Sequence, residues 1–198
     1  MSIAITAALA AENTTMPNAR TAAPAADSKT VDALLAAVAD GNMDSLETLY
    51  GIAATPVYSF ALSILRNRYD AEDVLHDCFL SIVRSAAGYR SHGKPMAWIL
   101  TITRNLCMSK LRETGRESSL DDESAGQFEA LPDAVDVEEK FLLEALINSL
   151  GAEERQIVTL HLTAGFKHRE IADLLDLPLS TVLSKYSRAL KKLRAMTE

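Results

Sequence analysis

Residues 168–193 carry hydroxyl and cationic side chains at a spacing suited to binding a polyanion. A short helix, a tight break at 176–178 and a second amphipathic helix follow in the order of a helix-turn-helix. One side of the second helix is apolar, and the other carries groups that contact phosphates and base edges in a major groove. The residues predicted to contact DNA are Ser180, Thr181, Ser184, Lys185, Arg188, Lys191 and Lys192. A solvated basic helix without a ligand is the alternative.

Residues 71–86 form a second informative helix, with two unlike sides. The apolar side, predicted to pack in a bundle, holds Val74, Leu75, Cys78, Phe79, Ile82 and Val83. The opposite side holds Asp73, His76, Asp77, Leu80 and Arg84. A solvated surface would explain most of that side, but a leucine among carboxylates indicates a surface for a protein partner.

Residues 95–112 form a third helix, which begins with Pro95 in a permitted first-turn position. It is apolar around most of its circumference, so we expect it to pack on two sides, with Trp98 as a packing residue. The remaining strip carries side chains that donate to phosphates and base edges, namely Thr101, Arg104, Asn105 and Arg112.

The charges are divided unevenly along the chain. The net charge is −7, yet residues 84–116 hold seven basic side chains and one acidic one. Every charge in residues 117–139 is negative, and every charge in residues 177–197 is positive. Two basic units therefore flank an acidic connector, and the overall charge does not exclude a nucleic-acid partner.

Helical periodicity with no strand pattern predicts an all-α protein of two small domains, a bundle and a helix-turn-helix domain. We expect a disordered tail at 1–29, a first domain of four helices at 30–113, an acidic flexible linker at 114–136 and a second domain of four helices at 137–198. Turns are expected at 40–42, 66–70, 88–95, 150–151, 165–167 and 176–178.

Composition excludes several classes of protein. With 48% hydrophobic and 24% charged residues the chain is globular, and no uncharged apolar run is expected to approach the eighteen or so residues that span a membrane. Cys78 and Cys107 give neither a disulfide framework nor a zinc spacing, which favours the reducing cytoplasm. The histidines are scattered and no phosphate loop is present, so we expect no enzyme, no metal and no cofactor.

Three motifs together resemble the sigma-70 factors of bacterial RNA polymerase, in the two-domain extracytoplasmic-function (ECF) group. The run from Asp70-Ala-Glu-Asp to Phe-Leu is similar to the family's polymerase-binding helix. The run Ala97-Trp-Ile-Leu-Thr-Ile-Thr-Arg-Asn-Leu is similar to the helix at the upstream edge of the −10 element. The segment with Glu170-Ile-Ala, Thr181-Val and Arg188-Ala-Leu is similar to the −35-binding helix-turn-helix.

The resemblance implies a factor that binds core RNA polymerase, recognises −35 and −10 promoter elements and promotes promoter melting, while the polymerase does the chemistry. The outer side of residues 71–86 would bind the polymerase, and the strip on 95–112 would contact the −10 DNA. The loop before that strip would capture the melted −10 strand through Tyr89, Arg90, His92 and Lys94. An anti-sigma partner is common in the group.

Several positions depart from the family pattern, among them His76, Val83 and Thr101. A fourth is Leu183, at a position where the family usually has a lysine. We expect Leu183 to add to the packing beside Leu190 rather than contact a thymine methyl. The main rival function is a stand-alone helix-turn-helix regulator whose N-terminal helices sense a ligand or dimerise. A helical adaptor that binds no nucleic acid would leave the cationic helix unexplained.

Overall fold

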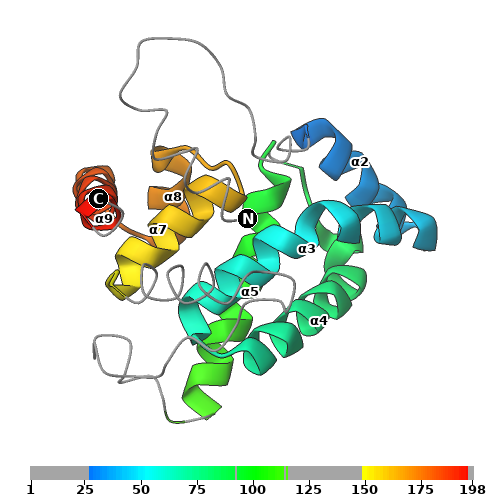
Figure 1. Ribbon diagram of the computed structural model, residues 1–198. Helices are drawn as coiled ribbons and strands as arrows, with labels where there is room; N and C mark the ends of the chain where they lie inside the picture. Colours follow the sequence, from blue (N-terminus) through cyan, green and yellow to red (C-terminus); the bar gives the residue numbers. More distant parts are fainter. Residues whose placement is uncertain (1–26, 92, 114, 116–148, 196–198) are drawn as a thin grey trace. The chain divides into compact units, whose positions relative to one another are not determined.

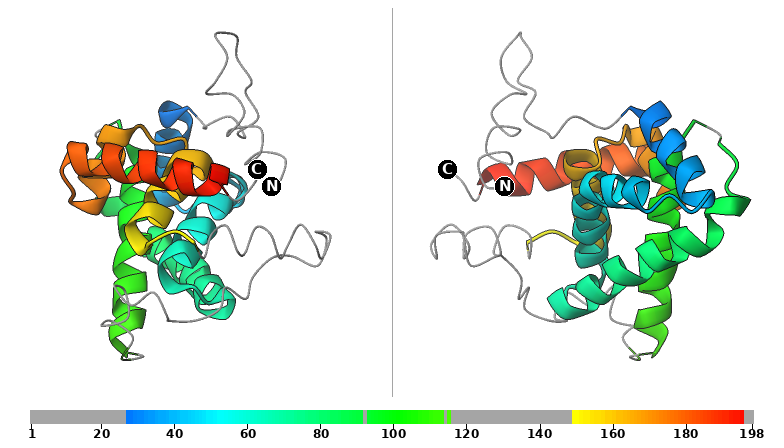
Figure 2. Two further views of the ribbon diagram at one scale, coloured as in Figure 1. Left: turned by 60° about the vertical axis from the view of Figure 1, so that its left-hand side comes forward. Right: turned by 90° about the vertical axis from the view of Figure 1, so that its right-hand side faces the viewer.

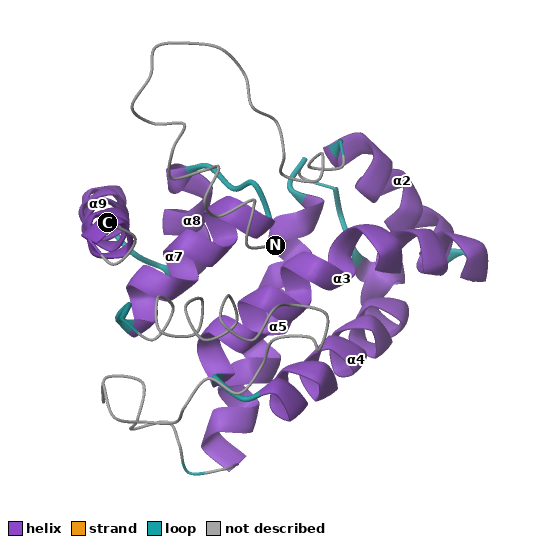
Figure 3. Cartoon of the chain, in the orientation of Figure 1, coloured by secondary structure: helices purple, strands orange, loops and turns teal. Residues whose placement is uncertain are grey.

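The computed structural model describes residues 27–91, 93–113, 115 and 149–195 (Figure 1). All regular structure in these ranges is helical, which confirms the all-α prediction (Figure 3). The chain divides into two compact units, one spanning Ala26–Asp122 and the other containing Glu123–Glu198, and each is described by itself. Nearly all of the predicted linker (114–136), nearly all of the predicted tail (1–29) and the helix predicted between residues 137 and 149 lie outside the described residues.

The N-terminal unit contains the four predicted helices, α2 (Ser28–Ala39), α3 (Met43–Leu65), α4 (Arg68–Ser85) and α5 (Pro95–Glu113), with a short 3-10 turn η1 (Ala86–Gly88). Asparagine caps set two of the helix starts. The Asn42 side chain accepts from the Ser45 N–H at 3.0 Å, and Asn67 accepts from the Asp70 N–H at 3.0 Å. Helix α2 begins at Ser28, so the predicted tail extended two residues too far.

Helix α3 is the central helix of this unit and packs against α2, α4 and α5 (Figures 1 and 2). Its residues 48–65 are an uncharged run of eighteen, so the expectation that no such run exists was wrong. Met43–Leu65 is long and apolar enough to cross a membrane, with a mean hydropathy of 1.4. Its apolar surface instead forms the core of the bundle, where Leu49, Val57 and Phe60 are almost completely buried.

Helices α4 and α5 meet through small and sulfur-containing side chains. The Thr103 hydroxyl donates to the Ile99 carbonyl at 3.1 Å and lies 3.4 Å from the Cys78 sulfur. Burial raises the pKa of the Cys78 thiol to about 11 and that of Cys107 to about 12. Both cysteines are free, buried and neutral, and they serve as packing residues.

The C-terminal unit contains α7 (Ala152–Thr163), α8 (His168–Leu175) and α9 (Leu179–Ala195), with α9 packed on both of the others (Figure 2). The predicted breaks at 150–151, 165–167 and 176–178 are confirmed. Asp176 ends α8 in the left-handed conformation with φ 56°, which turns the chain into α9. The helix-turn-helix is therefore present as predicted.

Three aromatic rings hold these helices together. The imidazoles of His161 and His168 stack with their centroids 4.9 Å apart. Both rings meet the edge or face of Tyr186 on α9, at 5.0 and 4.6 Å. Each helix contributes one ring, so the orientation of α9 is fixed by packing at its middle.

Candidate nucleic-acid and protein interfaces

Helix α9 presents a packed side and an outward side, as the sequence predicted. Val182, Ala189 and Leu193 are at most 4% exposed and seat the helix on its unit. The predicted DNA-contacting residues all reach the surface: Thr181 and Lys185 are partly exposed and the others are exposed. Ser187 is also exposed, three residues after Ser184, and was not among the predicted contacts.

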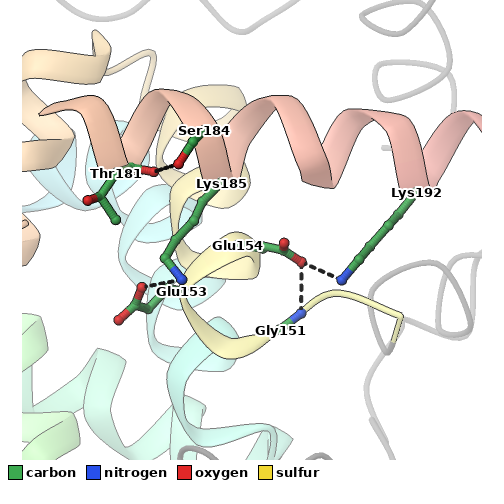
Figure 4. A network of polar contacts seen from close by, with 7 residues as sticks. All are labelled: Gly151, Glu153, Glu154, Thr181, Ser184, Lys185 and Lys192. Carbon is green, nitrogen blue, oxygen red and sulfur yellow. Dashed lines mark hydrogen bonds and ion pairs between the residues drawn. The ribbon is translucent and has the colours of Figure 1, made fainter.

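Two of the predicted DNA contacts are engaged within the protein. Figure 4 shows Lys185 and Lys192 reaching from α9 to two adjacent glutamates at the start of α7. The Lys185 ammonium lies 2.9 Å from a carboxylate oxygen of Glu153, and the Lys192 ammonium lies 2.8 Å from one of Glu154. The periodicity of α9 could not reveal these pairs, because the glutamates lie 32 and 38 residues earlier in the chain than their lysines.

The two ion pairs differ in their surroundings. The Glu154 side chain is only 7% exposed, whereas that of Glu153 is 46% exposed. Burial raises the pKa of Glu154, but the hydrogen bonds from Lys192 and from the Gly151 N–H outweigh burial and leave this pKa below its ordinary value. Glu154 is thus a structural anion, while Glu153 is a surface group beside a predicted DNA contact.

Leu183 lies at the surface, contrary to the prediction that it packs beside Leu190. Its side chain is 47% exposed, and Leu179, one turn earlier, is 36% exposed. Leu190 is partly buried. The prediction failed because Leu183 stands about 100° around the helix from the buried Val182, beyond the edge of the packed side.

The outer side of α4 is exposed at all five predicted positions, Asp73, His76, Asp77, Leu80 and Arg84. Val83 was expected in the packed side but is 43% exposed, close to the 40% of Leu80 three residues before it. The outer side therefore carries two neighbouring apolar side chains among charges. Its position is fixed through Lys110 on α5, whose ammonium pairs with Asp73 at 2.5 Å and with Asp70 at 3.6 Å.

The strip on α5 is present, with Thr101, Asn105 and Arg112 exposed and Arg104 partly exposed. Trp98 is half-buried and packs against the ring of Tyr89, with the centroids 4.8 Å apart. Trp98 is therefore a packing residue, as expected, and its contact fixes the position of the loop that precedes α5.

That loop is anchored to α2 by a carboxylate. The Tyr89 hydroxyl donates to one oxygen of Asp32 at 2.6 Å, and the Ser91 hydroxyl donates to the other at 2.8 Å. Burial, the hydrogen bond to Asp32 and its negative charge raise the pKa of Tyr89 to about 12. The sequence did not indicate this anchor, because Asp32 lies 57 residues before Tyr89.

The cations of the loop lie at the surface beside this anchor. Arg90 and Lys94 are exposed, and the Arg90 guanidinium donates to the Tyr89 carbonyl at 3.2 Å. His92 lies outside the described residues. Among the residues that the structure does describe, no group of three or more His, Cys, Asp or Glu side chains is placed to hold a metal ion.

Comparison with known families matches both units. The model for sigma-70 region 2 matches residues 49–117, and the model for sigma-70 region 4 matches residues 140–193. The first match contains α4 and α5, and the second contains the helix-turn-helix.

Two individual relatives agree with these family matches. The ECF RNA polymerase sigma factor SigK of Mycobacterium ulcerans is 26% identical over 178 residues, covering 86% of this chain and 95% of that protein. The RNA polymerase sigma factor CarQ of Myxococcus xanthus is 29% identical, covering 79% and 91%.

Two solved structures share the fold. One is the sigma factor RpoE in complex with the anti-sigma factor NepR from Bartonella quintana, with a TM-score of 0.62 and 22% identity over 76% of this chain and 95% of that chain. The other is CnrH in complex with the cytosolic domain of CnrY, with a TM-score of 0.52 and 20% identity over 85% and 97%. The helix-turn-helix, the bundle before it and the matches to both sigma regions identify the chain as a member of the ECF group of the sigma-70 family.

Proposed function

We propose that this protein is a promoter-specificity subunit, in which α9 reads the −35 element, α5 and its preceding loop act on the −10 element, and the outer side of α4 binds core RNA polymerase. The observation that carries the proposal is the presence, in one chain, of both family regions, with those predicted contact residues that the structure describes exposed or partly exposed. Sigma factors are not enzymes, so the polymerase performs the phosphodiester chemistry, and we place this protein with it in the cytoplasm.

The outer side of α4 suits a protein partner. Leu80 and Val83 offer apolar area, and His76, Asp77 and Arg84 surround them with charge and hydrogen-bonding groups. An apolar centre with a polar rim is the usual composition of a protein interface. In this proposal Asp73 both faces the partner and holds α4 to α5 through Lys110, so its role is partly structural.

The DNA-facing residues divide by what they can contact. On α9, Arg188 and Lys191 are exposed cations suited to phosphates or guanine, and Ser180, Thr181 and Ser184 are short groups for base edges or phosphates. On α5, Arg104 and Arg112 offer cations, and Thr101 and Asn105 offer smaller polar groups. Arg90 and Lys94 extend that positive surface into the preceding loop, where a melted strand would pass.

Control by a protein partner is a further part of the proposal. RpoE of Bartonella quintana, which shares this fold, was solved with an anti-sigma factor. We expect this chain to bind an anti-sigma partner too, and such a partner would hold it inactive by covering surfaces needed for polymerase or DNA.

The experiment that tests the function is transcription in vitro from a library of genomic fragments, using core polymerase from the same organism with and without this protein. Start sites that depend on the protein and share two upstream boxes are the expected result. Polymerase-independent footprints on duplex DNA, with no new transcripts, would support a stand-alone helix-turn-helix regulator instead. A library that gives neither would contradict both functions.

A further inference from the structure

Leu183 is an exposed apolar side chain on the part of α9 that carries the predicted DNA contacts. It is the fifth residue of the helix, and the N-terminal residues of a recognition helix are those that reach base edges. Its side chain is 47% exposed, immediately before Ser184 on the outward side. Single exposed leucines are common on protein surfaces. This one, however, stands among the groups that would enter a DNA groove.

The chemistry of the major groove restricts what this side chain can contact. Each base pair presents hydrogen-bond donors and acceptors there, and the thymine C5 methyl is the one apolar group. A leucine placed against a G·C edge would cover donors and acceptors without bonding to them, which is unfavourable. The same leucine against a thymine methyl would bury apolar surface on both sides.

The neighbouring residues allow the approach. Arg188 and Lys191 are exposed on the outward part of the same helix and would hold it against the phosphate backbone. Nearer the start of the helix, Ser180 and Ser184 are short, so they leave room for a base edge to come close to Leu183.

We infer that Leu183 is a specificity-determining residue that reads the methyl group of a thymine in the −35 element, so this element contains at least one A·T pair whose thymine is recognised through its methyl. The inference rests on the proposed function, because it requires α9 to bind the −35 element. It identifies one base pair class that the −35 element must contain.

Uracil substitution tests the contact directly, because uracil keeps the hydrogen-bonding pattern of thymine and lacks only the methyl. Each thymine of the −35 element, once the transcription experiment has defined that element, is replaced singly by deoxyuridine. Promoter binding by the holoenzyme is then measured with the wild-type protein, with Leu183→Ala and with Leu179→Ala. Leu179 is the matched control, since it is also a partly exposed leucine of α9 but lies closer to the packed side.

The expected result is one position at which uracil weakens wild-type binding by about fourfold, the value for one buried methyl group. Leu183→Ala is expected to weaken binding to the thymine promoter and to lose the response to uracil, whereas Leu179→Ala keeps that response. Because Leu183 is exposed, Leu183→Ala should not disturb folding, so misfolding would not account for weaker DNA binding. Unchanged polymerase binding by Leu183→Ala confirms that the variant is folded.

Three results would overturn the inference while leaving the proposed function intact. They are a −35 element without A·T pairs, a wild-type response that is absent at every thymine, and a response that Leu183→Ala retains in full. Absence of any protein-dependent transcript is a different result, which defeats the proposed function and this inference with it.

Discussion

Lys192 on α9 donates to Glu154 on α7 at 2.8 Å, and the same carboxylate oxygen accepts from the Gly151 N–H at 3.2 Å (Figure 4). One oxygen therefore caps the start of α7 and binds the recognition helix to it. Lys192 was predicted to contact DNA, but this geometry gives it a structural role in the helix-turn-helix unit.

Lys192→Ala is expected to lower the stability of the C-terminal unit by about 1 to 2 kcal/mol, since it leaves a buried carboxylate without its cation. Hydrogen exchange at the amides of α7 and α9 measures the change locally. Lys191→Ala is the matched control, because Lys191 is exposed and next in sequence. Lys191→Ala should leave hydrogen exchange unchanged. It should make the slope of log affinity against log salt concentration for −35 binding shallower by about 0.9, the value for one lost phosphate contact. Equal protection in both variants would contradict the structural role of Lys192.

The ion pair between Lys192 and Glu154 also predicts how the stability of the C-terminal unit changes at acidic pH. A lowered pKa means that Glu154 contributes stability above its unfolded pKa, near 4.5, and that this contribution is lost as the pH falls through the lower folded pKa. We expect urea denaturation of the wild-type unit to show this loss on acidification below about pH 4.5. Glu154→Gln should be less stable at pH 7 and should respond less to pH in that range. An unchanged pH response in Glu154→Gln would contradict the assignment.

Glu153→Gln is expected to strengthen −35 binding. The glutamate competes with a DNA phosphate for Lys185, and it places a negative charge near the DNA backbone. An exposed ion pair of about 0.2 to 1 kcal/mol corresponds to a gain of about 1.5- to 5-fold in affinity, largest at low salt. Fluorescence anisotropy with a −35 duplex and holoenzyme measures it, with Glu170→Gln as the control, since Glu170 caps α8 instead. Weaker binding by Glu153→Gln would show that Glu153 positions Lys185 rather than competing with DNA.

Asp32→Ala is expected to slow promoter opening while leaving polymerase binding and −35 recognition intact. The substitution removes both hydrogen bonds that hold Tyr89 and Ser91, so the loop before α5 loses its anchor. Permanganate footprinting of the melted strand measures opening. Tyr89→Phe keeps the ring on Trp98 and loses one hydrogen bond, so its defect should be smaller. An opening rate for Asp32→Ala equal to that of the wild type would contradict the anchoring role.

Leu80→Ala and Val83→Ala are each expected to weaken core polymerase binding by about 1 kcal/mol. That is the free energy gained when an interface buries the apolar area that each side chain still exposes on the free protein. Both side chains are about 40% exposed, so folding should be little affected. Met43→Ala, at 65% exposed on α3, controls for the loss of surface apolar area. Size-exclusion chromatography and competition with another sigma factor measure binding. A defect as large in Met43→Ala would show that the effect is not specific to α4.

Periodicity predicted the helices α4, α8 and α9 well, because each buries one side that is visible as a stripe within a single segment. Helix α3 differs, since its residues 60–65 are buried all round. The limits of those stripes were harder to place. Val83 and Leu183 stand at their edges, and only the positions of neighbouring helices decide whether such a residue is covered. Partners distant in the sequence were not predictable at all, since nothing near Tyr89 or Lys192 signals Asp32 or Glu154.

The two buried thiols have a consequence for signalling. Oxidants react with thiolates, and burial raises the pKa of Cys78 to about 11 and that of Cys107 to about 12, so both thiols are protonated at neutral pH. Both cysteines of the chain are also shielded from solvent within one helical bundle. The two thiols of the folded protein are therefore protected from peroxide, and a response to oxidative stress through cysteine chemistry would need a thiol outside this chain.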